Sequence, residues 1–157
     1  MVLALPRRRV RLSERQQEVV LLTGLGYTAP EIAKELKLSL HTVRDHLSSA
    51  HAKLGTHSAT AMVHAAYETG AVPEPVALAT KLLFEGIQLQ LLQGMSQGHD
   101  TAALAKQLGF PSRREANAEC RRLLRHLKVK RRPHLMTRAR QFGLLGTQCG
   151  PLNPPPP

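Results

Sequence analysis

The sequence predicts an all-α protein made of two small four-helix units in tandem. Aromatic residues make up only 3% of the chain and Trp is absent, and the alternating β-branched and aromatic patterns typical of strands are nearly missing. The hydrophobic content of 42% is still enough for cores of Leu, Val and Ala packed between helices. Residues that can cap a helix are each followed in the sequence by apolar residues at helical spacing. The length of 157 residues suits one medium domain or two small ones.

The first predicted helix begins after Ser13. Gln16 can complete a capping box with Ser13, because each side chain can bond the backbone N–H of the other residue. The apolar residues within 19–22 supply a buried face at helical spacing. Gly24 and Gly26 are expected to end this helix.

Two further short helices follow, joined by a tight turn. Thr28 caps the first of them, Glu31 closes a capping box, and Pro30 lies in the first turn, where its missing N–H costs little. Ser39 caps the next helix, which is expected to stop at Gly55. Two helices joined in this way form a helix-turn-helix, whose second helix enters the DNA major groove.

A set of residues in the first half has a recognisable order and spacing. It consists of Leu12-Ser13, Glu18-Val19-Val20, Leu22, Gly26, Thr28, Glu31-Ile32-Ala33, Leu36, Leu38-Ser39, Thr42-Val43-Arg44, His46 and Lys53-Leu54-Gly55. Over residues 10–72 the chain resembles, without a gap, the four-helix LuxR/GerE-type DNA-binding domain. The resemblance implies a bacterial transcription regulator whose third helix reads DNA and whose fourth helix often pairs subunits.

The fourth helix of this unit is predicted between the capping residue Ser58 and Gly70, and it is rich in small residues. Such a surface allows another helix to approach closely, and in the resembled family this position often forms the dimer contact. The alternative is that its apolar side covers only its own domain. The candidates for a dimer or interdomain contact are Ala59, Met62 and Ala66.

The predicted reading helix carries side chains that suit base edges. Arg44 offers a planar fork that matches O6 and N7 of guanine. Asp45 would accept a hydrogen bond from a cytosine amino group, unless it forms a surface salt bridge with Arg44 or a cap. Ser48 lies one turn beyond Arg44 and faces the same side. The candidate base contacts are Arg44, Asp45, Ser48 and His41.

Hydroxyl groups, helix N-termini and basic side chains of the same unit are candidates for contacts with DNA phosphates. These candidates are Thr28, Ser39, Thr42, His46 and Lys53. His46 matches the histidine of the resembled family, and its alternative role is to orient the helix through an internal hydrogen bond.

The segment 73–79 contains two prolines and is predicted to be a linker, because proline breaks helices. Beyond it, the chain aligns with its own first half at an offset of 72 to 73 residues. The aligned pairs include Val19-Val20 with Leu91-Leu92, Gly26 with Gly98, Thr28 with Asp100, Leu54 with Leu127, Met62 with Leu135 and Gly70 with Gly143. Caps, turns and core positions are shared, so residues 80–145 are predicted to be a diverged copy of the first unit, 12–72.

The second unit differs in its reading helix and in its charge. Residues 115–119 depart from the family motif at every position that residues 42–46 occupy in the first unit, so base readout there is in doubt. Residues 74–157 carry a net charge of +8, against +3 for residues 1–73. Such an excess is either a solvated face or a phosphate-binding surface, and the helix-turn-helix setting favours phosphate. The candidate phosphate contacts are Arg113, Arg114, Arg121, Arg122 and Arg125.

The net charge of +11 favours a polyanionic partner, because neutralised phosphates release counterions. Residues 1–11 form an arginine-rich arm that either lies along a phosphate backbone or in a minor groove, or is a solvated leader. The proline-rich tail, residues 146–157, is expected to be disordered.

Several classes of protein and site are not expected. The chain lacks a nucleophile turn, a Gly-rich phosphate loop and clustered acids, so neither an enzyme nor a cofactor is predicted. His41, His46 and His51 recur every five residues, which spreads them around a helix and disfavours a metal site. Cys120 and Cys149 are interpreted as reduced thiols. No signal peptide or membrane span is recognised, so a cytoplasmic, nucleoid-associated protein is expected.

The function predicted from these features is sequence-specific binding of double-stranded DNA in transcription regulation. The first unit would read bases in the major groove, and the second would contact phosphates or mediate dimerisation, with a homodimer through the fourth helix as one arrangement. The alternative is a protein-interaction adaptor that docks on RNA polymerase, a sigma factor or another regulator through the degenerate second unit.

Overall fold

A computed structural model describes residues 9–79 and 82–145, and in these two ranges the protein is all-α with eight helices and no strand. The helices are α1 Glu14–Gly24, α2 Ala29–Leu36, α3 Leu40–Leu54, α4 Ala59–Glu68, α5 Gly86–Ser96, α6 Thr101–Gln107, α7 Arg113–His126 and α8 Arg132–Gln141. The predicted all-α class is therefore confirmed. Most of the arginine-rich arm (1–8) and the tail (146–157) lie outside the described residues.

The helices of the first half start and stop where the sequence places caps. Ser13 and Gln16 form the predicted capping box, with the Gln16 amide donating to Ser13 Oγ at 3.2 Å. Ser39 Oγ accepts from the Thr42 amide at 3.0 Å and starts α3. Gly55, with φ of 66°, ends α3 in the left-handed conformation that glycine adopts at least cost.

Two hydrophobic cores hold the helices together. The smaller one lies within the first three helices and contains Val19, Ile32, Ala33 and Val43. The larger one runs through both halves of the chain, from Val20 on α1 to Leu135 on α8. Because α4 contributes to this larger core, the two halves share buried apolar surface and do not form two separate hydrophobic cores.

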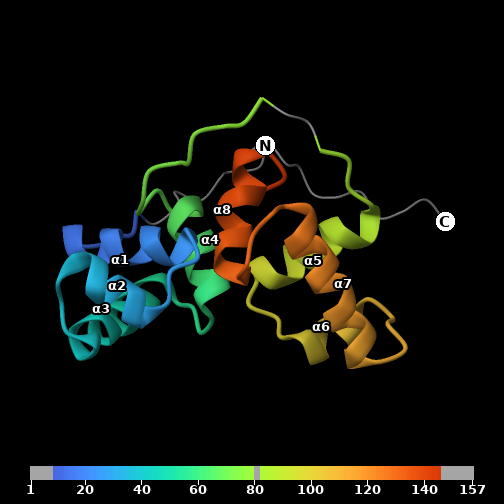
Figure 1. The fold of residues 1–157 in the computed structure, drawn as a ribbon, viewed down its shortest axis with the longest axis horizontal. Coiled ribbons are helices and arrows are strands. Elements are labelled where there is room, and N and C mark those ends of the chain that lie inside the picture. Colours follow the sequence, from blue (N-terminus) through green and yellow to red (C-terminus); the bar gives the residue numbers. More distant parts are fainter. Residues whose placement is uncertain (1–8, 80–81, 146–157) are drawn as a thin grey trace, which may run out of the picture.

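The α4–α8 pair is the centre of the molecule. Figure 1 shows α1, α2 and α3 on one side of this pair and α5, α6 and α7 on the other. The contact of α4 with α8 is the most extensive between any two helices, and it is flanked by two reciprocal contacts, α1 on α8 and α4 on α5. At one of these, a Cβ on Gly24 would lie 2.7 Å from Thr137 Oγ1, so the close approach of α1 to α8 requires glycine there.

A polar cluster with a buried arginine at its centre lies at the C-terminal ends of α4 and α8. The Arg140 side chain is only 3% exposed; it donates to Glu68 Oε1 at 2.8 Å and to both carboxylate oxygens of Glu74. Its Cζ also lies 5.3 Å from the centre of the Tyr67 ring. Nearby, burial lowers the pKa of His64, whose Nδ1 has no hydrogen-bond partner among the described residues.

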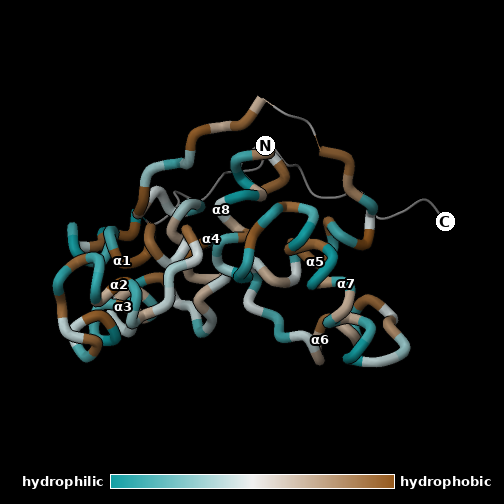
Figure 2. Tube along the Cα trace, in the orientation of Figure 1, coloured by the Kyte–Doolittle hydropathy of each residue, from teal (hydrophilic) through white to brown (hydrophobic). Residues whose placement is uncertain are grey.

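The linker crosses this same end of the helix pair. The Leu78 amide donates to the Gln141 carbonyl at 2.8 Å, and Glu74 binds Arg140 as described above. Figure 1 shows the linker as an arch over α4 and α8, and Figure 2 shows a hydrophobic stretch along that arch. The linker therefore covers the C-terminal ends of α4 and α8, whereas their N-terminal ends point away from it.

The turns of the two halves have matching backbone geometry. Positive φ angles occur in four pairs, namely Gly26 (91°) with Gly98 (88°), Lys37 (54°) with Gly109 (72°), Gly55 (66°) with Lys128 (55°) and Gly70 (69°) with Gly143 (71°). The members of the first two pairs are 72 residues apart and those of the last two are 73 apart. Left-handed backbone is uncommon outside glycine, and yet in two of the pairs a lysine in one half matches a glycine in the other. The two halves therefore share turn geometry even where their sequences differ.

Candidate nucleic-acid interface

One face of α3 is anchored in the small core and the other is open to solvent. Val43 and Ala50 are fully buried, which fixes the rotation of the helix about its axis. The four candidate base contacts are all exposed: His41, Arg44, Asp45 and Ser48. Arg44 and Asp45 lie three and four residues after His41, and Ser48 lies four and three residues after them, so the four side chains share one helical face.

The Asp45 carboxylate does not form the salt bridge with Arg44 that the sequence offered as one alternative. Asp45 Oδ2 lies 3.3 Å from His41 Nε2, one turn earlier, and not in a salt bridge with Arg44. Neighbouring residues on a helix do not face each other, whereas residues four apart do. Among the residues that the structure describes, none pairs with Arg44, so its guanidinium is available to an external acceptor.

The candidate phosphate contacts of this half fall into two groups. Around the starts of the helices, the Ser39 and Thr42 hydroxyls share a hydrogen bond of 2.8 Å, and Thr28 Oγ1 donates to Glu31 at 2.8 Å. The Thr28 amide also donates to Glu31 at 2.6 Å, and these two hydrogen bonds, the amide's first and then the hydroxyl's, lower the pKa of the Glu31 carboxyl with help from the charge of Arg131.

The other two candidates lie along α3. His46 is half-buried. Lys53 Nζ donates to Gln16 Oε1 on α1 at 2.8 Å, which holds its ammonium group against the first helix.

This geometry is that of a helix-turn-helix whose second helix has one face open to solvent, and comparison with known proteins identifies the same motif. The family described as "Bacterial regulatory proteins, luxR family" matches residues 10–66. Residues 10–66 are a LuxR-family helix-turn-helix domain.

A relative of this LuxR-family domain is the HTH-type transcriptional activator RamA of Corynebacterium glutamicum, which is 38% identical over 63 residues. The aligned region is 40% of this chain and 22% of RamA, so the chain spans about a fifth of that protein's length. No solved structure matches the chain.

Outside the LuxR-family domain, α7 presents the arginines that the sequence singled out. Arg113, Arg114, Arg121, Arg122 and Arg125 are all exposed. Arg122 Nη1 contacts Glu119 at 3.2 Å. At an offset of 73 residues, the buried Ala116 takes the place of Val43, and Arg114 and Arg121 take the places of His41 and Ser48. The α7 counterpart of the reading face is thus strongly basic.

The fourth helix of the LuxR-family domain is largely covered within the chain itself. Met62 and Ala66 are fully buried, and Ala59 is half-buried. The helix that packs most extensively on α4 is α8 of the same chain.

Sequence reasoning missed the polar groups at the seam between the two halves. Arg140 lies four residues after Met136 on the buried side of α8. This helical spacing could have indicated that the Arg140 side chain is buried. The burial of Thr60, on the first turn of α4, could not be predicted from the sequence, because its neighbours come from α8 and the α5–α6 turn.

Within the two described ranges, no group of three His, Cys, Asp or Glu residues is placed to hold a metal ion. Cys120 is buried, and that burial raises the pKa of its thiol; Cys149 lies outside the described residues. No helix in the described part of the chain is long and apolar enough to span a membrane.

Proposed function

We propose that the protein is a sequence-specific DNA-binding transcription regulator in which α3 reads base edges in the major groove. The observation that carries this proposal is the open face of α3, with an unpaired guanidinium at its centre, in a LuxR-family domain. Such a regulator would act in the cytoplasm, at the nucleoid.

The side chains on this face supply complementary hydrogen-bonding groups. Arg44 would bind O6 and N7 of a guanine, the commonest specific major-groove contact. Asp45, held beside His41, would accept a hydrogen bond from a cytosine amino group and disfavour other bases. Ser48 would reach a base or phosphate one turn further along, while Ser39 and Thr42 lie at the helix N-terminus, where phosphates bind.

The second half is, in this proposal, a diverged copy that takes the place of a second subunit. The four matching pairs of left-handed residues support a duplication, and so do caps at equivalent positions such as Thr28 and Asp100. The reciprocal contacts of α1 with α8 and of α5 with α4 have the form of an isologous interface, in which two patches exchange roles. One chain would thereby have the arrangement of a symmetric dimer.

This arrangement assigns different tasks to the two reading helices. In the first half, α3 determines which DNA sequence is bound. In the second half, Arg114 and Arg121 on α7 bind backbone phosphates, a contact that has no base preference. The bound site is therefore expected to be asymmetric. A homodimer would have to form through a surface other than the buried part of α4.

Substitutions of Arg44 test the proposal. Arg44→Ala is expected to weaken binding to the cognate site by about 1–3 kcal/mol, roughly 5- to 150-fold in Kd, and to weaken binding to random duplex much less, because only one positive charge is lost there. Arg44→Lys keeps the charge and loses the fork, so it should lose specificity and retain affinity for random duplex. Competition gel-shift assays measure both quantities.

Arg121→Ala serves as the matched control in these assays. It removes one exposed positive charge from α7, so it should weaken cognate and random duplex alike and reduce the salt dependence of binding. Equal losses on both duplexes for Arg44→Ala would reject base readout by α3.

A second candidate function is docking of α7 on a protein such as RNA polymerase or another regulator. It is favoured by the half-buried Asn117 and Ala118, which occupy the positions of Arg44 and Asp45 and offer little for base readout. A purified partner that stays bound at high salt, where phosphate contacts fail, would support docking.

A further inference from the structure

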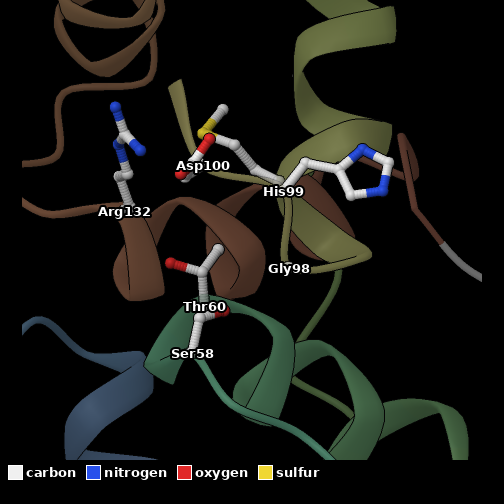
Figure 3. Close-up of a pocket in the computed structure, with 7 residues that line it drawn as sticks. Ser58, Thr60, Gly98, His99, Asp100 and Arg132 are labelled. Carbon is white, nitrogen blue, oxygen red and sulfur yellow. The ribbon is translucent and has the colours of Figure 1, made fainter. Parts of the chain in front are cut away.

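We propose that a pocket at the junction of the two halves binds a single phosphate group, which adds a specific anchoring point to the proposed DNA-binding function. The pocket has a volume of about 150 Å³ and lies between the N-terminal turn of α4, the N-terminus of α8 and the α5–α6 turn. Figure 3 shows Ser58 and Thr60 on one side, Arg132 on another, and Gly98 and Asp100 on a third. A cavity of this size can hold a compact ligand, since about 150 Å³ is enough for benzene.

The lack of a hydrogen-bond partner for the Thr60 hydroxyl indicates that the pocket can bind a ligand. Thr60 is only 8% exposed, and within the described ranges its hydroxyl makes no hydrogen bond. The hydroxyl oxygen keeps contact with solvent through the pocket that it lines, so its hydrogen-bonding capacity is available to a ligand that fills this pocket. In Figure 3 the hydroxyl points to the Arg132 side of the pocket, whereas the His99 ring points away from it.

The remaining donors suit an oxyanion. Ser58 Oγ accepts a hydrogen bond from the Ala61 amide at 3.1 Å, which leaves the hydroxyl proton free to be donated. Arg132 Nη2 donates to Thr101 Oγ1 at 2.7 Å, and this bond fixes the guanidinium while its other N–H groups remain. The first amides of α4 are unsatisfied by the helix and carry its positive dipole end.

Asp100 limits the charge that the pocket accepts. Its Oδ1 caps α6 by accepting from the Ala103 amide at 2.8 Å, and its carboxylate lines the pocket opposite Arg132. The carboxylate offsets part of the positive charge, so a phosphodiester with one negative charge fits better than a dianion.

The position of the pocket agrees with contact to a DNA backbone. The linker covers the C-terminal ends of α4 and α8, so the pocket lies at the opposite, uncovered end. Next to it, Arg131 Nη1 lies 3.5 Å from Glu31 on α2, the first helix of the helix-turn-helix. Asp100 is also the counterpart of Thr28, a candidate phosphate contact. The same donors would bind free inorganic phosphate, so the two sources must be separated by experiment.

The first arm of the test is a titration of the full chain with inorganic phosphate at constant ionic strength, followed by amide chemical shifts. Thr60→Val removes the hydroxyl and conserves volume, so the fold and its stability should persist while phosphate binds about tenfold more weakly. Arg132→Gln should also weaken binding. Asp100→Asn keeps a capping residue and removes the opposing charge, so it should tighten binding.

The second arm measures duplex DNA affinity against salt. If the ligand is a DNA phosphodiester, Thr60→Val weakens cognate and random duplex alike, and Arg132→Gln, which removes a positive charge, also lowers the salt slope by about 1. If the ligand is free phosphate, only the titration responds. The proposal is overturned if Thr60→Val and Arg132→Gln change neither measurement.

The same data distinguish this proposal from base readout by α3. Arg44→Ala should leave the phosphate titration unchanged. A wild-type chain that ignores duplex DNA yet binds phosphate through Thr60 would refute the DNA-binding function and leave the pocket standing. Sequence-specific binding that depends on Arg44 but not on Thr60 or Arg132, with no phosphate titration, would refute the pocket alone.

Discussion

Replacing Arg140 with alanine is expected to lower the free energy of unfolding by about 3 kcal/mol, the lower end of the range for breaking a buried ion pair. The Arg140 side chain is 3% exposed and holds Glu68 on α4 and Glu74 on the linker. The Glu74 side chain is largely exposed and can regain water when the arginine is lost, which keeps the cost from being higher. Urea unfolding followed by circular dichroism measures the change.

Arg122→Ala is the matched control for this substitution. The Arg122 side chain is 68% exposed, so water screens its contact with Glu119, whose side chain is 14% exposed; the loss of Arg122 should lower the free energy of unfolding by at most about 1 kcal/mol. A double-mutant cycle with Glu74→Gln isolates the coupling between the linker and α8. An Arg140→Ala protein as stable as Arg122→Ala would show that the buried cluster contributes nothing to holding the linker on the two halves.

Leu135→Ala is expected to lower the free energy of unfolding by about 2–5 kcal/mol, because the fully buried side chain leaves a cavity. Leu135 lies on α8 within the core that also contains Val20 of α1 and Met62 of α4. Since that core joins the halves, the variant should unfold in one transition at lower urea, with helices of both halves lost together.

Leu83→Ala provides the comparison for this loss of apolar volume. Leu83 is 91% exposed, so the same truncation there should have almost no effect on stability. Two separate transitions for Leu135→Ala, with the first half unfolding at the wild-type urea concentration, would contradict a shared core.

Local features of the fold could be predicted from the sequence because they depend on near neighbours. Ser39 and Gly55 define α3 through a cap and a left-handed turn, both of which are properties of a few consecutive residues. The same holds for the Ser13 capping box. The start of α2 follows in the same way from the capping box of Thr28 with Glu31 and from Pro30, whose backbone fits a first turn.

The features that could not be predicted depend on how α4 and α8 meet. Nothing local to Arg140 indicates that Glu68 and Glu74 will surround it, because these partners are far away in sequence. The unpaired hydroxyl of Thr60 likewise arises only when the α5–α6 turn closes over α4. The pairing of Asp45 with His41 is different: helical spacing alone favours it over pairing with Arg44.

Selection of bound sequences from a pool of randomised DNA duplexes tests most directly the claim that α3 reads bases while the second half replaces a partner subunit. The wild-type chain should enrich one asymmetric sequence, bound by a single chain per duplex, and Arg44→Ala should lose preference at a guanine within it. If the selection enriches no sequence, or enriches a palindrome that holds two chains and is unaffected by Arg44→Ala, the account is contradicted.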